Sequence, residues 1–345
     1  MSEGVTAGGQ RQGAARRHTL GEVAAAAGVS PATVSRVING FRYISPQVRV
    51  AVERAIDELG YVPNRAARTL VTRRTDSIAL IVCEPQERLY ADPYFAIMAR
   101  ALTLALADTD LQLVLLMART QQHRRRAVSY AVNGHVDGVL LTSVHGSDPL
   151  PHTLVQAGVP LVLNGPPAAT GVPLYVDVDN VRGGQQAAQH LRSAGRRRFT
   201  MIAGPADMRS AADRLDGFRR GVVRLSRNAV VHGDYGMESG RNAMSELLSR
   251  VPDLDAVFVG SDQMAMGALQ VLHRAGRRIP DDVAVVGFDD IPEAPFADPP
   301  LTTFHQPFDD MAQAMVTLLL SQIQDRRTRL EPIVLPAQLV VRESG

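Results

Sequence analysis

The sequence has no tryptophan, no lysine and a single cysteine, Cys83, among its 345 residues. One thiol cannot build a disulfide framework or a multi-cysteine zinc site, which suits a reducing compartment. Without lysine, a Walker-type phosphate loop and lysine chemistry are both excluded. The nine histidines are scattered without metal-ligand spacing. We therefore expect no metal site and no bound cofactor.

Long apolar runs are also absent. No stretch of 18 apolar residues occurs, and the first 18 residues contain no apolar segment of the kind that a secretory signal needs. We therefore expect a cytoplasmic protein without a membrane span. With 45% hydrophobic and 21% charged residues, the chain can bury a large core and should fold into two or three domains.

Charge is distributed unevenly along the chain. Residues 1–75 hold eleven arginines and five acidic residues, a net charge of +6, whereas residues 76–345 carry a net charge of −4. A basic segment of this size suits contact with nucleic-acid phosphates, and such binding weakens steeply with salt. Residues 1–18 are rich in Gly, Ala, Gln and Arg, so we expect a disordered basic tail.

The stretch TLGEVAAAAGVSPATVSRVIN, residues 19–39, predicts two short helices joined by a tight turn. Thr19 and Glu22 have the spacing of a capping box, which predicts a helix over residues 20–27. Gly28 suits the turn, and Ser30 followed by Pro31 predicts the start of a second helix that ends near residue 39.

The apolar residues of this helix pair can share one small core, which leaves Ala32, Ser35 and Arg36 on the opposite face. An ordinary capped helical hairpin would show a similar pattern. The order of capped helix, Gly-Val-Ser-Pro turn and TVSRVIN helix is more specific than that. It resembles the lactose and purine repressor (LacI/GalR) family of bacterial transcription regulators.

The resemblance implies a helix-turn-helix domain over residues 19–62 that reads the major groove of DNA. Arg36 is the strongest candidate for base reading, because a guanidinium can bond a guanine edge through two hydrogen bonds. Pro31 and Ala32 offer only apolar contact to bases, and Thr33 and Ser35 are expected to touch phosphates. The DNA-contacting residues of this domain are expected to be Thr19, Pro31, Ala32, Thr33, Ser35, Arg36 and Asn39.

A third helix is predicted from Pro46, after a Ser45 cap, to a Gly60 end. Residues 63–75 follow, and within them PNRAARTL, residues 63–70, predicts a helix too short to be stable alone. Composition alone would make this segment a linker. The resemblance implies instead a hinge helix that pairs in a dimer, with Ala67 at the floor of the minor groove and Leu70 as a wedge between base pairs.

From residue 77 the pattern changes to alternating strands and helices, which predicts an α/β fold of doubly wound parallel sheets. One large Rossmann-like domain is an alternative. Two halves of similar length, together with the resemblance, favour a two-lobed body like periplasmic binding proteins, with three crossovers and a cleft. We expect residues 76–345 to form this effector-binding and dimerisation domain, with an N-lobe of about 76–168 and 303–330 and a C-lobe of about 169–302 and 331–345.

Several local details are expected in this body. LYVDV, residues 174–178, should begin the second half, and a helix should start at Arg214. An arginine there would oppose the positive end of the helix dipole, so its presence would need a bound ligand or an acidic partner. Asp262 should cap the helix that it begins.

Enzymatic activity is not expected. No G-x-G-x-x-G follows the first strand, and no G-x-S-x-G occurs. The adjacent pairs at residues 281–282 and 289–290 are more typical of solvated or ligand-binding carboxylates than of a catalytic dyad. Nothing assembles a nucleophile, a base and an orienting group, so no catalytic residue is predicted.

Ligands of open α/β lobes bind where strands end. Arg214 and Asp289 would pair a forked donor with a charged acceptor, which suits vicinal sugar hydroxyls or a purine edge. Tyr235 could stack on a ligand, although Tyr94, Phe95 and Tyr235 could equally be ordinary, partly buried aromatics. The resemblance implies the following effector-binding set: Tyr94, Phe95, Asn164, Arg214, Tyr235, Ser261, Asp289 and Gln306.

The sequence thus predicts a homodimeric transcription regulator, a repressor, that binds double-stranded operator DNA under the allosteric control of a small-molecule effector. A sugar is the first choice of effector, and a purine or nucleoside is the second. The alternative is a solute-binding or enzymatic protein whose N-terminal helices serve another role. The basic N-terminal segment of residues 1–75 and the hinge motif within it favour the regulator.

Overall fold

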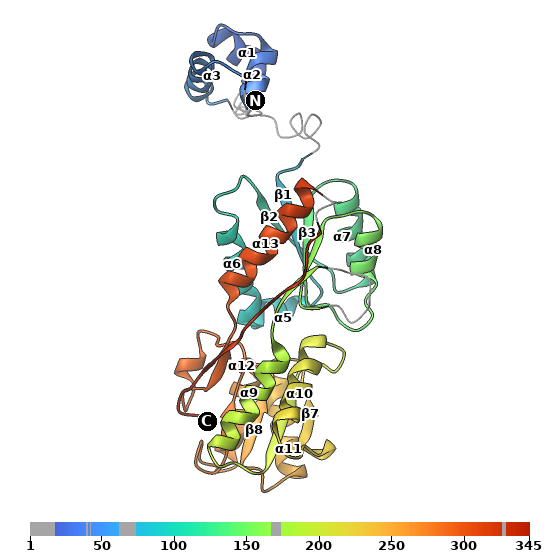
Figure 1. Ribbon diagram of the computed structural model, residues 1–345, viewed down its shortest axis with the longest axis vertical. Coiled ribbons are helices and arrows are strands. Elements are labelled where there is room, and N and C mark those ends of the chain that lie inside the picture. Colours follow the sequence, from blue (N-terminus) through green and yellow to red (C-terminus); the bar gives the residue numbers. More distant parts are fainter. Residues whose placement is uncertain (1–17, 39–40, 42, 62–73, 167–173, 326–328) are drawn as a thin grey trace, which may run out of the picture. The chain divides into compact units, whose positions relative to one another are not determined.

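The computed structural model describes residues 18–38, 41, 43–61, 74–166, 174–325 and 329–345. The chain divides into two compact units, Met1–Thr75 and Asp76–Gly345 (Figure 1). The predicted N-terminal tail and the hinge motif, together with Asn39, Ala67 and Leu70, lie outside the described residues.

The described part of the first unit consists of α1 (Leu20–Ala26), α2 (Pro31–Ile38) and α3 (Pro46–Leu59). The predicted capping box is present, because the Glu22 amide donates to Thr19 Oγ1 at 3.3 Å and the Thr19 amide donates to Glu22 Oε2 at 2.7 Å. The Ser45 hydroxyl caps α3, which ends at Gly60 with a φ of 57°. Local capping signals therefore fixed these helix ends.

The three helices share one apolar core. Val23, Val34 and Val52 are fully buried in it, and Tyr61 packs back onto the same cluster. The predicted core of α1 and α2 is thus confirmed, and it leaves Ala32 and Arg36 exposed on the opposite side of α2.

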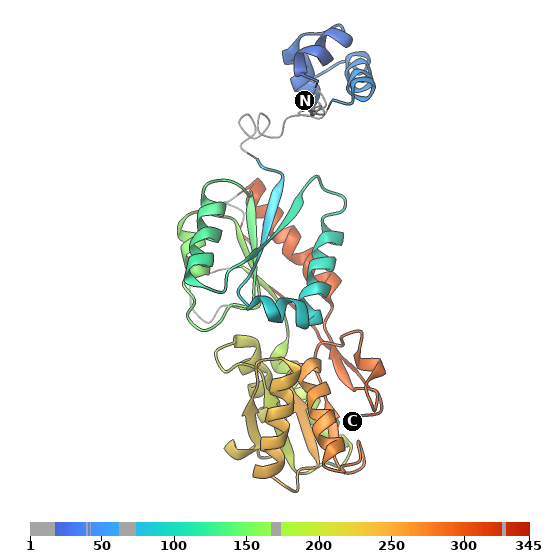
Figure 2. The same ribbon diagram turned by 180° about the vertical axis from the view of Figure 1, so that it is seen from behind.

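The N-lobe of the second unit is built around a parallel sheet in the order β11-β5-β4-β3-β1-β2. Helices α6 and α13 cover one face, and α7 and α8 cover the other (Figures 1 and 2). Alternate residues of the first strand show this arrangement, because Leu80 packs in the cluster of α6 and α13 whereas Ile81 packs in that of α7 and α8. The described elements are β1 (Ser77–Val82), α5 (Gln86–Ala91), α6 (Pro93–Ala105), β2 (Gln112–Met117), α7 (Gln121–Val132), β3 (Gly138–Thr142), α8 (Leu150–Gln156), β4 (Leu161–Asn164), β5 (Tyr175–Val178), α13 (Phe308–Gln324) and β11 (Ile333–Leu335).

The C-lobe has a second parallel sheet in the order β7-β6-β8-β9 and an antiparallel ribbon of β10 and β12. Residues of α9 and α10 join the core cluster on one side of the sheet, and those of α11 and α12 join the other. The described elements are α9 (Asn180–Ser193), β6 (Phe199–Ala203), α10 (Arg209–Gly221), η1 (Arg227–Ala229), β7 (Val230–His232), α11 (Met237–Arg250), β8 (Ala256–Val259), α12 (Asp262–Arg274), β9 (Ala284–Val286), η2 (Ala294–Phe296), β10 (Thr303–His305) and β12 (Gln338–Val340).

Two parts of the expected lobe division are wrong. β5 and β11 were expected in the C-lobe, but both belong to the N-lobe sheet, where β5 pairs with β4 and β11 pairs with β5. β10 was expected in the N-lobe, but it pairs with β12 of the C-lobe. A strand pattern shows that a segment is extended and buried, but it does not specify which neighbour the strand pairs with.

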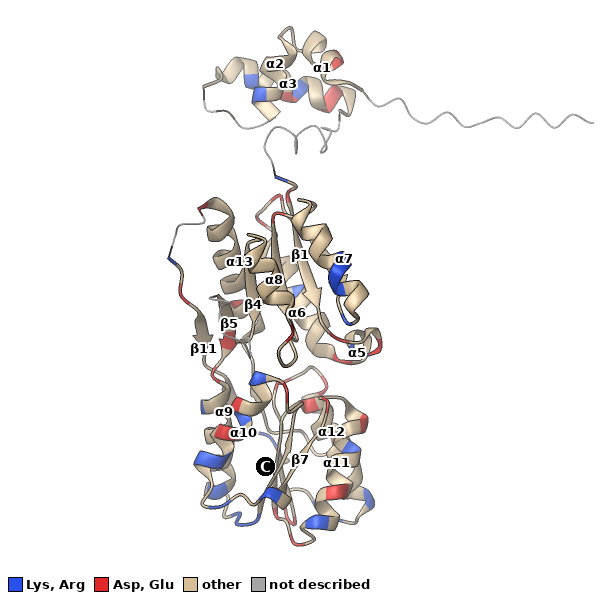
Figure 3. Ribbon diagram, turned by 90° about the vertical axis from the view of Figure 1, so that its right-hand side faces the viewer, with Lys and Arg blue, Asp and Glu red and all other residues tan. Residues whose placement is uncertain are grey.

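The chain passes between the lobes at three places within the described body: after β5, after β10 and between β11 and β12. These crossings keep the two sheets adjacent. Basic and acidic residues are interspersed over the helices of the C-lobe (Figure 3).

The contact between α9 and α10 depends on glycine. A Cβ atom at Gly184 would lie 2.2 Å from the carbonyl oxygen of Arg214 and 2.7 Å from the amide nitrogen of Phe218, both backbone atoms. Gly184→Ala is therefore expected to lower the free energy of unfolding of the body by about 1–3 kcal/mol, the usual cost of overpacking. Chemical denaturation measures this. The control is Gly21→Ala, whose Cβ would meet only Thr19 Oγ1 at 3.8 Å, and equal stability of the two variants would contradict the prediction.

No helix within the described ranges has both the length and the apolar character needed to cross a bilayer.

Candidate functional site

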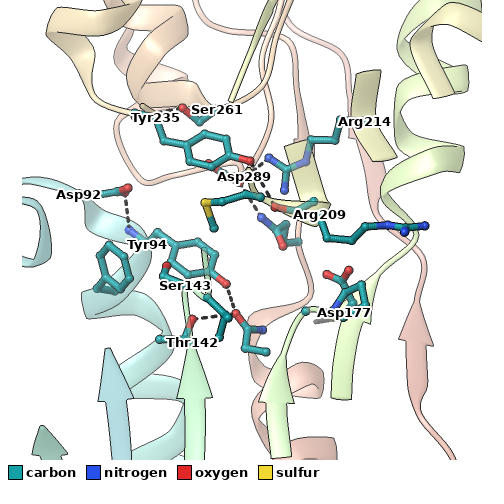
Figure 4. A pocket seen from close by; sticks show the side chains of 18 of the residues that line it. Asp92, Tyr94, Thr142, Ser143, Asp177, Arg209, Arg214, Tyr235, Ser261 and Asp289 are labelled. Atoms are coloured by element: carbon teal, nitrogen blue, oxygen red, sulfur yellow. Dashed lines mark hydrogen bonds and ion pairs between the residues drawn. The ribbon is translucent and has the colours of Figure 1, made fainter. Parts of the chain in front are cut away.

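A pocket lies between the two lobes of the second unit and holds about 710 Å³, counting its open mouth (Figure 4). It forms at the edge where strands of both sheets end, as expected for open α/β lobes. All eight residues of the predicted effector set line it: Tyr94, Phe95, Asn164, Arg214, Tyr235, Ser261, Asp289 and Gln306. The structure therefore brings together residues that are up to about 210 positions apart in the sequence.

On the N-lobe side, Asn164 is the last residue of β4 and Tyr94 lies in the first turn of α6. The Tyr94 hydroxyl donates to Asn164 Oδ1 at 2.5 Å, and the Thr142 hydroxyl donates to the same oxygen at 3.1 Å. Burial raises the pKa of the Tyr94 phenol, so the phenol stays protonated and remains a donor. The amide of Asn164 is thereby held in one orientation.

On the C-lobe side, Arg214 is buried and its guanidinium is fixed on several sides. Its Nε donates to Asn180 Oδ1 at 2.8 Å, and its Nη1 donates to the carbonyl oxygen of Gly260 at 2.5 Å. The guanidinium carbon lies 3.7 Å from the centroid of the Phe288 ring, a cation–π distance. Nη1 is also 3.9 Å from Asp289 Oδ1.

The predicted start of this helix is wrong. α10 begins at Arg209 rather than at Arg214, so Arg214 lies in the second turn. The expected conflict with the helix dipole does not arise, because that effect is confined to the first turn. The true start has no local signal, because Met208 occupies the N-cap without a side-chain hydrogen bond.

Asp177 belongs to the network that holds Arg214, and it was not predicted from the sequence. The Asn180 amide nitrogen donates to Asp177 Oδ2 at 2.9 Å, and the Val178 amide donates to Asp177 Oδ1 at 2.8 Å. Burial raises the pKa of Asp177 to about 7. Asp177 thus orients the Asn180 amide so that its oxygen faces Arg214.

Asp289 places a buried acceptor beside Arg214. Gln306 Nε2 donates to Asp289 Oδ1 at 2.6 Å. Burial raises the pKa of Asp289 to about 7, although the positive charge of Arg214 acts in the opposite direction. The guanidinium of Arg214 and the carboxyl group of Asp289 therefore lie beside each other in the pocket wall. A donor next to an acceptor suits binding to neighbouring hydroxyl groups.

Backbone strain is concentrated at the pocket. Ser143, Tyr235 and Asp289 all line it, and their φ angles are 55°, 71° and 119°. Residues with a Cβ atom rarely adopt a positive φ. Those that do are concentrated at ligand sites, where the surrounding structure enforces the strained backbone. The Tyr235 hydroxyl also lies 3.2 Å from Ser210 Oγ.

Ser261, which lines the pocket, also caps α12 in place of Asp262. The Ser261 hydroxyl caps the helix by accepting from the Met264 amide at 3.3 Å. Asp262 was expected to be the cap, but its carboxylate is fully buried and accepts from Thr303 Oγ1 at 2.5 Å and from the Ile291 amide at 3.0 Å. Asp262 therefore ties α12 to the segments that follow β9.

Other residues of the pocket wall were not predicted from the sequence. Thr142 ends β3 and Ser143 follows it, so both could have been found by the strand-end rule that located Asn164. Arg209 and Ser210 were missed because the helix was expected to start later. The residues of the pocket lining that were not predicted are Arg88, Asp92, Thr142, Ser143, Val144, Gly165, Pro166, Asp177, Met208, Arg209 and Ser210.

In the first unit, Pro31, Ala32 and Arg36 are exposed on α2. Thr33 is half-buried, and its hydroxyl lies 2.9 Å from that of Ser30, which caps the helix. Ser35 is half-buried as well. The described residues of the predicted DNA-contacting set thus belong to α2, apart from Thr19, whose side chain forms the capping box of α1.

Comparison with known proteins identifies the family. The model of bacterial regulatory proteins of the lacI family matches residues 19–64, and the model of the periplasmic binding protein-like domain matches residues 188–345. The HTH-type transcriptional regulator CelR of Thermobifida fusca is 49% identical over 338 residues, which are 96% of this chain and 99% of CelR. The chain belongs to the LacI family of bacterial transcriptional regulators.

Solved structures of this family agree with the fold. The structure of a CelR–cellobiose complex matches with a TM-score of 0.75 at 46% identity, over 95% of this chain and all of that one. The lac repressor dimer bound to operator and the anti-inducer ONPF matches with a TM-score of 0.83 at 27% identity, over 95% and 99% of the two chains. The matched proteins are regulators rather than enzymes. The predicted family and the predicted fold class are thus confirmed.

Within the described residues, no group of three or more His, Cys, Asp or Glu is placed to hold a metal ion.

Proposed function

We propose that this LacI-family protein is a repressor that binds operator DNA as a homodimer and that a disaccharide, cellobiose or a close relative, controls its operator affinity. The observation that carries the proposal is the similarity to CelR proteins: CelR of Thermobifida fusca is 49% identical over nearly the whole chain, and a CelR solved as a cellobiose complex is 46% identical. Because operator DNA lies in the bacterial cytoplasm, we propose that the protein acts there.

The chemistry of the pocket supports a sugar effector. Arg214 and Asp289 offer a donor and an acceptor to vicinal hydroxyls, and Tyr94 and Tyr235 offer flat apolar faces to sugar rings. Without tryptophan in the chain, stacking on a sugar must use such residues.

DNA binding rests on the basic first unit. Its net charge of +6 over residues 1–75 favours phosphate contact, and the exposed Arg36 on α2 is the proposed base-reading residue. Two copies would read the two halves of a pseudo-palindrome. By family resemblance, Ala67 and Leu70 are proposed to enter the minor groove between these halves.

Calorimetric titration of the full-length protein with cellobiose tests the proposed effector. Maltose serves as the α-linked isomer, glucose as the half-molecule, and hypoxanthine represents the purine alternative. Binding of cellobiose in preference to the other three supports the proposal. Preference for hypoxanthine would replace it with a purine-responsive regulator.

An Asp177→Asn variant is expected to bind cellobiose about five- to tenfold more weakly, the loss typical of one disturbed hydrogen bond. Both carboxylate oxygens of Asp177 accept hydrogen bonds, and an amide offers only one acceptor. One donor would then face another, and the Asn180 oxygen would turn away from Arg214.

The matched control for this variant is Asp179→Asn. Asp179 caps α9 through the Arg182 amide, and asparagine caps a helix as well as aspartate does. Unchanged affinity is expected for the control. If Asp177→Asn also bound cellobiose like the wild type, its assigned part in positioning Arg214 would be wrong.

A further inference from the structure

Glu84 is a buried carboxylate outside the predicted site. It follows β1 and is only 2% exposed. Its Oε1 accepts from Arg88 Nη1 of α5 at 2.8 Å and lies 3.0 Å from His145 Nε2, in the segment that follows β3. One acidic group of the N-lobe therefore orients two side chains from different segments.

The His145 side chain reaches the other lobe. His145 Nδ1 lies 3.1 Å from both carboxylate oxygens of Asp207, in the C-lobe segment between β6 and α10. The next residue adds a backbone contact, because the Gly146 amide donates to the carbonyl oxygen of Asp207 at 2.8 Å. Neighbours of both partners line the pocket, namely Val144 and Met208.

The Arg88 side chain also reaches the C-lobe. The guanidinium carbon of Arg88 lies 5.2 Å from the centroid of the Tyr235 ring, and Tyr235 lines the pocket. The same guanidinium is 5.9 Å from the Phe95 ring and forms a longer ion pair of 3.7 Å with Asp92. The Arg88 side chain is 16% exposed, which strengthens a cation–π contact relative to one in water.

The ring of His145 needs a second proton to satisfy both partners. A neutral imidazole has one N–H, whereas Glu84 and Asp207 each present an acceptor to a different ring nitrogen, so only the imidazolium donates to both. These two hydrogen bonds raise the pKa of His145 above its usual value, while burial opposes them. Among the neighbouring charges, Arg88 faces Glu84, and Asp148 is paired with Arg124 of α7 at 2.8 Å.

We propose that Glu84, Arg88 and His145 of the N-lobe form a proton-dependent clasp with Asp207 and Tyr235 of the C-lobe. Glu84 is its positioning residue. The clasp holds the two lobes close enough for residues of both to line the effector pocket. The clasp strengthens effector binding because an effector that touches both lobes needs this separation. This last step rests on the proposed function; the clasp itself does not.

The sign of the pH dependence follows from the geometry. Below the pKa of His145 both hydrogen bonds are made and the clasp is closed. As the pH rises through that pKa, the ring loses one N–H, and one carboxylate then faces a lone pair. Loss of the clasp is therefore expected to weaken cellobiose binding by about tenfold between about pH 6 and about pH 9. Ionisation of Asp177 and Asp289, whose pKa values are raised to about 7, strengthens these acceptors over the same range in every variant. The contribution of the clasp is therefore the difference between the wild type and a variant that lacks it.

The test uses the full-length protein and three variants. Glu84→Gln removes the charge that orients both side chains, and Asp207→Asn removes the acceptor on the other lobe. Glu238→Gln is the control, because the exposed Glu238 pairs with Arg241 on α11 and is not among the residues that line the pocket. Proton NMR follows the titration of the His145 ring without effector, with the signal assigned by its loss in His145→Gln, and calorimetry gives the cellobiose affinity across the pH range.

The clasp predicts that the pKa of His145 drops in Glu84→Gln and in Asp207→Asn but not in Glu238→Gln. It also predicts that the advantage in cellobiose affinity of the wild type over the first two variants shrinks as the pH rises, whereas Glu238→Gln follows the wild type at every pH. An unchanged His145 titration in Asp207→Asn would overturn the clasp. A shifted titration with the wild-type pH dependence of affinity would overturn its coupling to the effector. If cellobiose fails to bind at every pH, the proposed effector is wrong, and the effector-free titration still decides the clasp.

Discussion

An Arg214→Ala variant is expected to lose at least about a hundredfold in cellobiose affinity, in line with the cost of removing one member of a buried charge pair. Arg214 donates to Asn180 and to the Gly260 carbonyl and lies beside Asp289. Without it, Asp289 loses the charge that holds its pKa down, so it becomes a more readily protonated, weaker acceptor. Calorimetry measures the affinity.

Alanine also leaves buried acceptors without donors, so Arg214→Lys is the companion variant. Lysine keeps the charge and most of the stem but not the planar fork. We expect it to fold, to bind operator DNA and to bind cellobiose about tenfold more weakly than the wild type. Wild-type affinity in a folded Arg214→Lys variant would mean that the fork of Arg214 does not hold the sugar.

The second large effect concerns DNA. Arg36→Ala is expected to reduce the preference for operator over random duplex by about 10- to 100-fold, because a bidentate contact to guanine supplies that discrimination. Weak, salt-sensitive binding to any duplex should remain, since it depends on the total basic charge. Competition gel shifts with operator and random DNA measure the ratio of the two affinities.

Arg54→Ala is the matched control for this variant. Arg54 is an exposed arginine of the same unit that forms a 2.7 Å ion pair with Glu58 along α3. The substitution removes one positive charge but no proposed base contact, so the ratio should be kept. If Arg36→Ala and Arg54→Ala gave the same ratio of operator to random binding, Arg36 would not read bases.

Local signals explain what the sequence alone could predict. The capping box of Thr19 and Glu22, the cap at Ser45 and the turn at Gly60 each act over a few residues, and the structure has all three. The eight pocket residues could be predicted because ligand contacts in such folds lie at strand ends or at family motifs. The structure gathers them around one pocket.

Long-range pairing explains what the sequence could not predict. The pattern of residues 174–178 marks a strand but not its partner, so β5 was expected in the wrong lobe and Asp177 was missed. Met208 gives no capping signal before α10, which displaced the expected helix start. Glu84, His145 and Asp207 meet only through the fold, since about 60 residues separate each from the next.

Control of operator binding by cellobiose is measured by quantitative binding of the full-length protein to its own upstream DNA, with and without the sugar. We expect binding that exceeds the binding to random duplex by at least about a thousandfold and that weakens with salt. Saturating cellobiose should change the operator affinity by about tenfold or more, while glucose should not. Equal affinity for operator and random duplex, whether or not cellobiose is present, would contradict the account.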